Sequence, residues 1–182
     1  MAIVKHLSND DQLDLVCEIV SRLKPKIYLE LGVKRGNTIS SIVPYSKRSI
    51  GVDINIPCKK IKGCEFYKMT TDVFFEKVKN KEIELTSLDV AFIDANHSKE
   101  NVLRDFYNVL SILKDSGVII LHDTYPKSER EIRCDKCGEA YLAAWEISIR
   151  NIPSIECFTL PIHPGLTFIR KRNYQVPWER SL

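Results

Sequence analysis

Hydrophobic residues along this chain follow two spacings, one typical of helices and one typical of buried strands. Apolar positions recur at helical intervals from Ser8 to Lys24 and again from Lys99 to Leu113. Around these segments lie short apolar runs, which have the length and composition of strands covered on both faces. Because strand-like and helix-like segments alternate, the chain is predicted to form an α/β fold around a mostly parallel sheet.

The same pattern places each element. Strands are expected at residues 27–31, 49–53, 65–69, 88–93, 117–121, 156–160 and 166–170. Helices are expected at residues 8–24, 37–45, 72–81, 99–113 and 140–150, the last with Trp145 in the core. Only residues 161–165 separate the final two strands, and so short a turn joins antiparallel neighbours. The expected architecture is a Rossmann-like, doubly wound, mostly parallel sheet with a C-terminal antiparallel hairpin.

Length and charge narrow the class of protein. A chain of 182 residues that is 44% hydrophobic can bury one core, so we expect a single domain over residues 1–172 and a loose tail over residues 173–182. The net charge of +3 comes from 27 basic and 24 acidic residues scattered along the chain. Without a basic stripe, nucleic acid is not the expected partner.

The cellular location follows from what the sequence lacks. No apolar run approaches the roughly 20 residues that span a bilayer, and the first residues do not form the apolar core of a secretion signal. Six cysteines in such a chain suit a reducing compartment. We therefore expect a soluble, cytoplasmic protein without membrane contact.

Polar and acidic residues gather directly after the predicted strands. In an open α/β sheet, ligands bind beyond the carboxyl ends of the strands, near the point where the strand order reverses. The segments at these ends are Glu30-Leu-Gly-Val-Lys-Arg-Gly36, Asp53, Thr70-Thr-Asp72, Asp94-Ala-Asn-His97 and His122-Asp123-Thr124. A ligand site is therefore expected at one edge of the sheet.

The first two of these segments indicate the kind of ligand. Gly32 and Gly36 permit a tight turn, but this turn lacks the G-x-G-x-x-G spacing that brings a diphosphate against a helix N-terminus. Asp53 ends the second strand, where an acidic side chain can accept hydrogen bonds from the ribose hydroxyls of a nucleoside. A nucleoside without a diphosphate is therefore favoured.

Five segments, taken in order, carry a resemblance to a known family. They are Tyr28 to Thr38, Met69 to Phe75, Phe92 to Glu100, Gly117 to Thr124 and Pro164 to Ile169. They resemble the successive motifs of class I S-adenosylmethionine-dependent methyltransferases, and the resemblance covers nearly the whole chain. Within that class, the pattern is most similar to small enzymes that resemble macrolide-sugar O-methyltransferases and, more distantly, catechol-type O-methyltransferases.

The resemblance implies a set of residues around S-adenosylmethionine. Those around its methionine portion are Glu30, Gly32, Gly36, Asn37 and Thr38. Those around its nucleoside are Asp53 on the ribose, Ile54 against the adenine, Thr71 and Asp72 at the adenine edge, and Asp94 bordering the cofactor.

The resemblance also implies a reaction, the O-methylation of a small, hydroxylated, sugar-like acceptor. A divalent metal (Mg²⁺, Mn²⁺ or Fe²⁺) would bind Asp94, His122 and Asp123, and His97 would act with Asp94 in catalysis as the base for the acceptor proton. The related sugar enzymes have two carboxylates where this chain has His122-Asp123. This departure leaves a Mg²⁺ site one hard ligand short and favours a softer ion.

Two other functions fit the same residues. The fold could serve as a non-catalytic cofactor-binding module. Alternatively, His97, His122 and one carboxylate form the ligand set of a non-haem iron oxygenase. No motif in this chain identifies the acceptor or distinguishes a monomer from a homo-oligomer.

The cysteines raise the separate question of a structural zinc site. Cys134 and Cys137 form a C-x-x-C pair, and Cys58 and Cys64 form a wider pair. Four thiolates can hold zinc, but the wide spacing of the Cys58 pair and the expected separation of the second and fifth strands argue against such a site. Reduced, unpaired thiols are expected.

Overall fold

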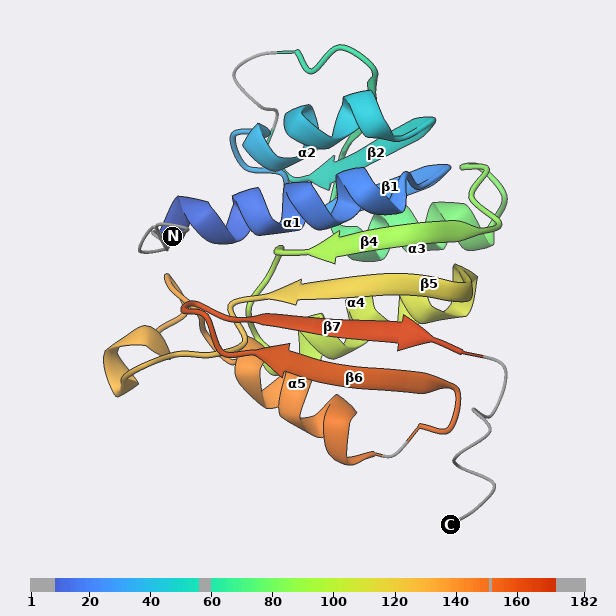
Figure 1. The fold of residues 1–182 in the computed structure, drawn as a ribbon. Helices are drawn as coiled ribbons and strands as arrows, with labels where there is room; N and C mark the ends of the chain where they lie inside the picture. The colour runs from blue at the N-terminus through green and yellow to red at the C-terminus, as the bar shows by residue number, and fades with distance from the viewer. Residues whose placement is uncertain (1–8, 56–59, 151, 173–182) are drawn as a thin grey trace.

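Strands and helices alternate along the chain, as the hydrophobic pattern predicted. The computed structural model describes residues 9–55, 60–150 and 152–172 (Figure 1). The strands are β1 (Ile27–Leu31), β2 (Arg48–Asp53), β3 (Cys64–Lys68), β4 (Leu88–Ile93), β5 (Leu113–His122), β6 (Ile155–Leu160) and β7 (Leu166–Lys171). The helices are α1 (Asn9–Leu23), α2 (Asn37–Ile42), α3 (Thr71–Lys79), α4 (Lys99–Ile112) and α5 (Ala140–Ile149), with short 3-10 helices at Val43–Tyr45 and Glu129–Glu131.

All the strands belong to one sheet, in the order β3-β2-β1-β4-β5-β7-β6. β1 to β5 are parallel, and β7 runs antiparallel to both β5 and β6. Leu29 of β1 lies opposite Ile50 on one side and Ala91 on the other, so β1 is central and the strand order reverses between β1 and β4. The predicted Rossmann-like fold class, with its C-terminal antiparallel hairpin, is confirmed.

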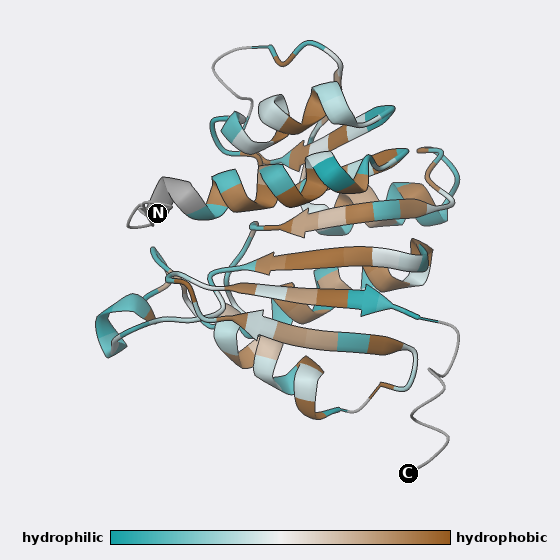
Figure 2. Cartoon of the chain, in the orientation of Figure 1, coloured by the Kyte–Doolittle hydropathy of each residue, from teal (hydrophilic) through white to brown (hydrophobic). Residues whose placement is uncertain are grey.

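Helices cover both faces of the sheet and create two cores. α3, α4 and α5 pack against one face, and α1 and α2 pack against the other (Figure 1). Neighbouring strand residues face opposite cores: Leu29 packs with the first set of helices and Tyr28 with the second. Figure 2 shows the central strands as largely apolar. This double coverage explains why the strands appear in the sequence as apolar runs without alternation.

The observed boundaries differ in detail from those predicted. The helix expected at residues 37–45 ends as an α-helix at Ile42 and continues as a 3-10 turn that contains Pro44, which has no amide hydrogen for an α-helical bond. β5 begins at Leu113 instead of Gly117. Ser8 and the predicted tail, residues 173–182, lie outside the described residues. Within the described part of the chain, no helix is long and apolar enough to cross a membrane.

The prediction that Trp145 lies in the core is wrong, because its side chain is 59% exposed. α5 is apolar around most of its circumference, so the spacing of apolar residues does not reveal which face is buried. Its buried face consists of Ala140, Ala143, Ala144 and Ile147. Three alanines on that face allow α5 to pack closely against the rest of the domain.

Candidate active site

Two cavities open at the carboxyl edge of the parallel strands. The loops after β4 and β5 emerge at this edge, on the left in Figure 1. Both cavities are lined by Gly32 and Lys34 of the loop after β1 and by Asp94 at the end of β4. Because β1 and β4 are the neighbours at which the strand order reverses, the cavities lie where this class of sheet places its ligands.

Gly32 allows the loop after β1 to lie directly against the end of β4. Its φ is +86°, and a Cβ built at this position would lie 2.1 Å from the backbone oxygen of Asp94. The Gly32 amide donates to the Val52 carbonyl (2.9 Å), and the Asp94 amide donates to the Leu31 carbonyl (2.8 Å). Gly36, predicted to shape the same pocket, precedes α2 with a φ of +80° and is not among the residues lining either cavity.

The first cavity has a volume of about 460 Å³ and lies beyond the ends of β2 and β3. The structure brings all the residues predicted for the nucleoside to its walls, namely Asp53, Ile54, Thr71, Asp72 and Asp94. Its other lining residues are Gly32, Lys34, Val52, Asn55, Met69, Thr70, Ala95, Asn96 and Asn101. Of the three asparagines, Asn96 lies within the strand-end segment Asp94–His97, whereas no motif in the sequence pointed to Asn55 or Asn101.

Two of the three acidic residues that line this cavity, Asp53 and Asp72, have different partners. Asp53 Oδ2 accepts hydrogen bonds from the amides of Val33 (2.9 Å) and Lys34 (2.8 Å), which fix the carboxylate against the loop after β1. Asp72 instead pairs with Arg104 of α4, with Oδ1 2.5 Å from Nε. Asp53 Oδ1 accepts a third amide hydrogen bond, from Asn55 (2.8 Å). Because each carboxylate oxygen can accept two hydrogen bonds, Asp53 is held in place and Oδ1 retains one acceptor position.

The second cavity has a volume of about 380 Å³ and lies between the loop after β1 and the ends of β4 and β5. It gathers residues predicted for the methionine portion and for the metal, namely Glu30, Gly32, Asn37, Thr38, Asp94, His122 and Asp123. Its other lining residues are Leu13, Val33, Lys34, Arg35, Phe92 and Pro164.

Glu30 is a fully buried carboxyl at the base of the second cavity. Burial raises its pKa to about 8, although a hydrogen bond from the Tyr28 hydroxyl (2.7 Å) acts in the opposite direction. The negative charges of Asp94 and Asp53 add to the increase. A positively charged group that enters this cavity would therefore restore the charge of Glu30.

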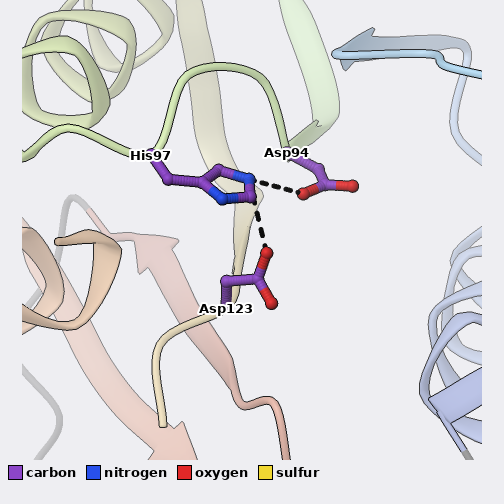
Figure 3. Close-up of side chains that lie close together, drawn as sticks. All are labelled: Asp94, His97 and Asp123. Carbon is purple, nitrogen blue, oxygen red and sulfur yellow. Dashed lines mark hydrogen bonds and ion pairs between the residues drawn. The ribbon is translucent and has the colours of Figure 1, made fainter. Parts of the chain in front are cut away.

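Two carboxylates and two imidazoles meet at the ends of β4 and β5. His97 Nε2 lies 3.1 Å from Asp94 Oδ1 and 3.3 Å from Asp123 Oδ2 (Figure 3). His122 Nδ1 lies 3.3 Å from the same two oxygens. Nitrogen and oxygen atoms thus alternate around a ring of four, which we call the His-Asp cluster. Ligand atoms of Asp94, His97 and Asp123 all lie within 4.8 Å of one another, close enough to share a metal ion.

The loop between β5 and α5 fixes the direction of the His97 ring. His97 Nδ1 contacts the carbonyl oxygen of Lys136, so this nitrogen carries the hydrogen. The Glu139 amide donates to the His97 carbonyl (2.7 Å), and a Cβ at Gly138 would lie 2.7 Å from His97 Cβ. Only Nε2 remains, and it faces the two carboxylates. His97 is not among the residues lining either cavity.

Electrostatic coupling in the His-Asp cluster is strong. Burial alone would raise the pKa of Asp94, but the adjacent His122 and His97 hold it well below its usual range. Burial lowers the pKa of His122, and the carboxylates of Asp123 and Asp94 outweigh it and raise the value to about 9. The pKa of His97 is raised by the same carboxylates against its own burial. The cluster therefore stabilises positive charge between its two carboxylates.

Sequence reasoning missed Lys34 and Lys136. Lys34 Nζ lies 3.2 Å from Asp94 Oδ2, on the side of the carboxylate turned away from the His-Asp cluster. A long cationic side chain within a glycine turn was the available signal for Lys34. Lys136 acts through its backbone oxygen, which carries no signature in a sequence.

The predicted cysteine pairs lie in different parts of the chain. Cys58 lies outside the described residues. Cys64 begins β3, at the amino edge of the sheet, whereas Cys134 (exposed) and Cys137 (buried) lie in the loop that follows β5 at the carboxyl edge. The described thiols thus face different surroundings, and Cys137 lies close to Asp123.

Comparison with known proteins places the chain in a family. Residues 29–124, more than half of the chain, match the family described as a methyltransferase domain. The chain belongs to this methyltransferase family. The matched segment runs from β1 to the residues just after β5, and so contains the His-Asp cluster, all the residues lining the first cavity and all those lining the second except Leu13 and Pro164. No curated protein matches the sequence of this methyltransferase.

Solved structures share the fold of this methyltransferase at low sequence identity. An O-methyltransferase from Bacillus cereus in complex with S-adenosylhomocysteine (SAH) is 14% identical, with a TM-score of 0.70 over 93% of this chain and 84% of that one. An SAH-bound methyltransferase from Podospora anserina is 18% identical, with a TM-score of 0.67 over 91% and 80%. The O-methyltransferase TomG from Streptomyces achromogenes, in complex with SAM and involved in tomaymycin synthesis, is 12% identical, with a TM-score of 0.65 over 91% and 82%.

Proposed function

We propose that this methyltransferase uses S-adenosylmethionine to methylate a hydroxyl oxygen of a small, sugar-like acceptor. The observation that carries the proposal is the pair of cavities that meet at Gly32, Lys34 and Asp94. One cavity presents the residues suited to a nucleoside, and the other presents those suited to an amino acid and a metal. The solved relatives named above bind SAM or SAH, which supports the same cofactor here.

The chain's own residues would orient the cofactor across both cavities. In the first cavity, the Asp53 carboxylate, already held by three backbone amides, would accept a ribose hydroxyl at the remaining position of Oδ1. In the second cavity, the buried carboxyl of Glu30 would pair with the cationic amino group of the methionine portion. Asn37 and Thr38, at the start of α2, would face its carboxylate.

The residues of the His-Asp cluster fit a divalent metal. Both ring nitrogens of His122 are buried without an aligned hydrogen bond, and such orphaned atoms favour a bound cation. Asp94, His122 and Asp123 line the second cavity and would hold the ion beside the acceptor. A metal bound there would supply Lewis-acid stabilisation of the acceptor oxygen as its proton leaves.

The acceptor oxygen would form its new bond to the methyl carbon while the bond between that carbon and sulfur breaks, and the acceptor proton would pass to the His-Asp cluster. Asp94 and Asp123 line the second cavity and would accept the hydrogen bond of the acceptor hydroxyl. The pKa of Asp94 is held well below its usual range, so Asp94 would orient this hydroxyl and would not keep its proton. His97, the predicted base, lines neither cavity and would act through these carboxylates, which lie 3.1 Å and 3.3 Å from its Nε2.

Titration of the folded protein with SAH, followed by calorimetry, tests the cofactor. We expect saturable binding that Asp53→Asn weakens by about tenfold to a hundredfold, because a hydrogen bond to a charged group contributes roughly 1.5–3 kcal/mol. Asp115→Asn, an exposed change at the amino edge of the sheet, is the matched control and should bind as wild type. Wild-type protein that is folded and yet gives no heat at high micromolar SAH would refute the proposed cofactor. Mass spectrometry of sugar-like hydroxyl compounds after incubation with SAM then tests the acceptor class.

A further inference from the structure

We infer that this chain binds a divalent transition ion of the zinc and iron class in preference to Mg²⁺, through four ligands that include His97. The four are Asp94, His97, His122 and Asp123. The inference goes beyond the proposed methyl transfer, because it concerns which ion the cluster takes and what His97 does there.

The spacing of the ligand atoms suits a small divalent ion. The four nitrogen-to-oxygen separations around the ring lie between 3.1 and 3.3 Å. A tetrahedral ion with ligand distances of about 2.0–2.1 Å requires neighbouring ligand atoms about 3.3–3.4 Å apart, so these separations already match. Ligand atoms of Asp94, His97 and Asp123 form one group within 4.8 Å, and the His122 ring would move toward His97 to complete the tetrahedron.

The direction of the His97 ring supports coordination. Because Nδ1 contacts the Lys136 carbonyl and carries the hydrogen, Nε2 is the nitrogen that faces the two carboxylate oxygens. A proton on Nε2 fills this place in the hydrogen bond to Asp94 Oδ1 (3.1 Å), and a metal ion would displace that proton and take its position. A metal ligand whose second nitrogen donates to a backbone carbonyl is the usual arrangement at protein metal sites.

His122 gives an independent observation. Its Nδ1 lies 3.3 Å from an oxygen of each carboxylate, yet neither ring nitrogen has an aligned hydrogen bond, and both atoms are shielded from solvent. The ring thus points between Asp94 and Asp123 and toward neither. This is the direction expected for an atom that coordinates an ion shared with both oxygens.

The chemistry of the donors excludes Mg²⁺ as the favoured ion. Mg²⁺ prefers an octahedron of oxygen ligands and retains several waters, whereas two imidazole nitrogens and two carboxylates suit Zn²⁺ or Fe²⁺. His97 and His122 supply those nitrogens, at 13% and 12% side-chain exposure. The loop carrying Lys136 and Gly138 packs over His97 and helps to keep bulk water away from the ion.

The experiment measures metal binding directly and does not depend on activity. The protein is first freed of metal with a chelator, and its fold is checked by circular dichroism. It is then titrated with Zn²⁺ in competition with a chromophoric chelator, in the presence of millimolar Mg²⁺. In a separate titration, Co²⁺ serves as a spectroscopic probe of coordination. We expect one equivalent of Zn²⁺ to bind despite the excess Mg²⁺, and Co²⁺ to give the intense visible bands of a tetrahedral site. His97→Ala should weaken Zn²⁺ binding by about a hundredfold or more, since even outer-shell changes cost about 10–100-fold.

Two further variants sharpen the test. His163→Ala removes a histidine that pairs with Glu131 (3.0 Å) outside the His-Asp cluster, and it should bind Zn²⁺ as wild type. His122→Glu replaces a nitrogen ligand by a carboxylate and should shift the preference toward Mg²⁺. Circular dichroism of each variant confirms that it is folded, and the wild-type Co²⁺ spectrum gives a result that requires no variant.

Three outcomes would overturn the inference. They are a folded wild-type protein that binds no Zn²⁺, one in which Mg²⁺ competes equally, and a His97→Ala variant with undiminished affinity. SAH binding is measured separately, so a protein that binds Zn²⁺ but no SAH would refute the proposed cofactor and leave the metal site standing. The reverse result would remove the metal site alone.

Discussion

The two cavities of this methyltransferase share a wall but are built by different means. The first is shaped by backbone: the loop after β1 lies against β4 through Gly32, and amides of that loop hold Asp53. The second is shaped by charge, because Glu30 and the His-Asp cluster gather buried ionisable groups around it. The first cavity should thus be sensitive to changes in chain geometry, and the second to changes in charge.

Gly32→Ala should have the largest effect, and it tests the geometric side of the comparison. The new Cβ would lie 2.1 Å from a backbone oxygen, so we expect a loss of about 3 kcal/mol or more in the free energy of unfolding, together with loss of SAH binding. Gly63→Ala is the matched control, because Gly63 has nearly the same φ (+85°) but, among the described residues, its added Cβ would meet the Val43 side chain and no backbone atom. It should lose only about 1–2 kcal/mol. Equal losses in urea unfolding would contradict the close approach.

Asp105→Asn tests a buried charge near the first cavity. Burial raises the pKa of Asp105 to about 6, so the folded state binds this proton more tightly than the unfolded state, and stability falls as pH rises from about 4 to about 6. The substitution should therefore raise the free energy of unfolding by about 1–3 kcal/mol at pH 7.5 and by much less near pH 4.5. Urea unfolding at both pH values measures this.

The control for Asp105 is a carboxylate with the opposite shift. Burial of Asp89 is outweighed by its hydrogen bond from Lys114 (2.9 Å), and its pKa is lowered. Asp89→Asn should therefore lower stability at neutral pH. If both variants changed stability in the same direction, the pKa shifts would not be the cause.

Lys34→Met should have the smallest effect of these substitutions, a change in Zn²⁺ affinity. It tests the role of Lys34, one of the residues that line both cavities. Lys34 is 64% exposed and pairs with Asp94, so removing its charge should tighten Zn²⁺ binding by about fivefold at most, as an exposed ion pair contributes roughly 0.2–1 kcal/mol. Lys34→Arg keeps the charge and should bind Zn²⁺ as wild type. Weaker Zn²⁺ binding in the methionine variant would show that Lys34 positions Asp94 and does not compete with the ion.

The parts of the molecule that follow from local pattern were predictable from the sequence. The fold class, the strands and the position of Asp53, Asp94, His122 and Asp123 at strand ends all follow from apolar runs and the rule that ligands bind at carboxyl edges. The buried face of α5 did not follow, because an apolar stripe cannot be recognised on a helix that is apolar nearly all round. Trp145 was misplaced for that reason.

The candidate site shows the same limit at a finer scale. The sequence placed His97 near the carboxylates but could not show which nitrogen faces them, because the Lys136 carbonyl decides it. That carbonyl belongs to the segment of residues 125–139, which has little regular structure. Such a segment has no hydrophobic periodicity from which its position could be predicted. Orientation set by backbone atoms of a distant loop is not visible in a pattern of side chains.

Adjacent placement of β4 and β5 has a consequence for how such enzymes diverge. Asp94 and Asp123 directly follow the two strands and His122 is the last residue of β5, whereas His97 belongs to the loop between β4 and α4. Three members of the His-Asp cluster are thus positioned by the sheet, and the fourth is positioned by loops and can be exchanged without changing a strand. A lineage could change its metal by substitution at one or two positions without rebuilding its architecture.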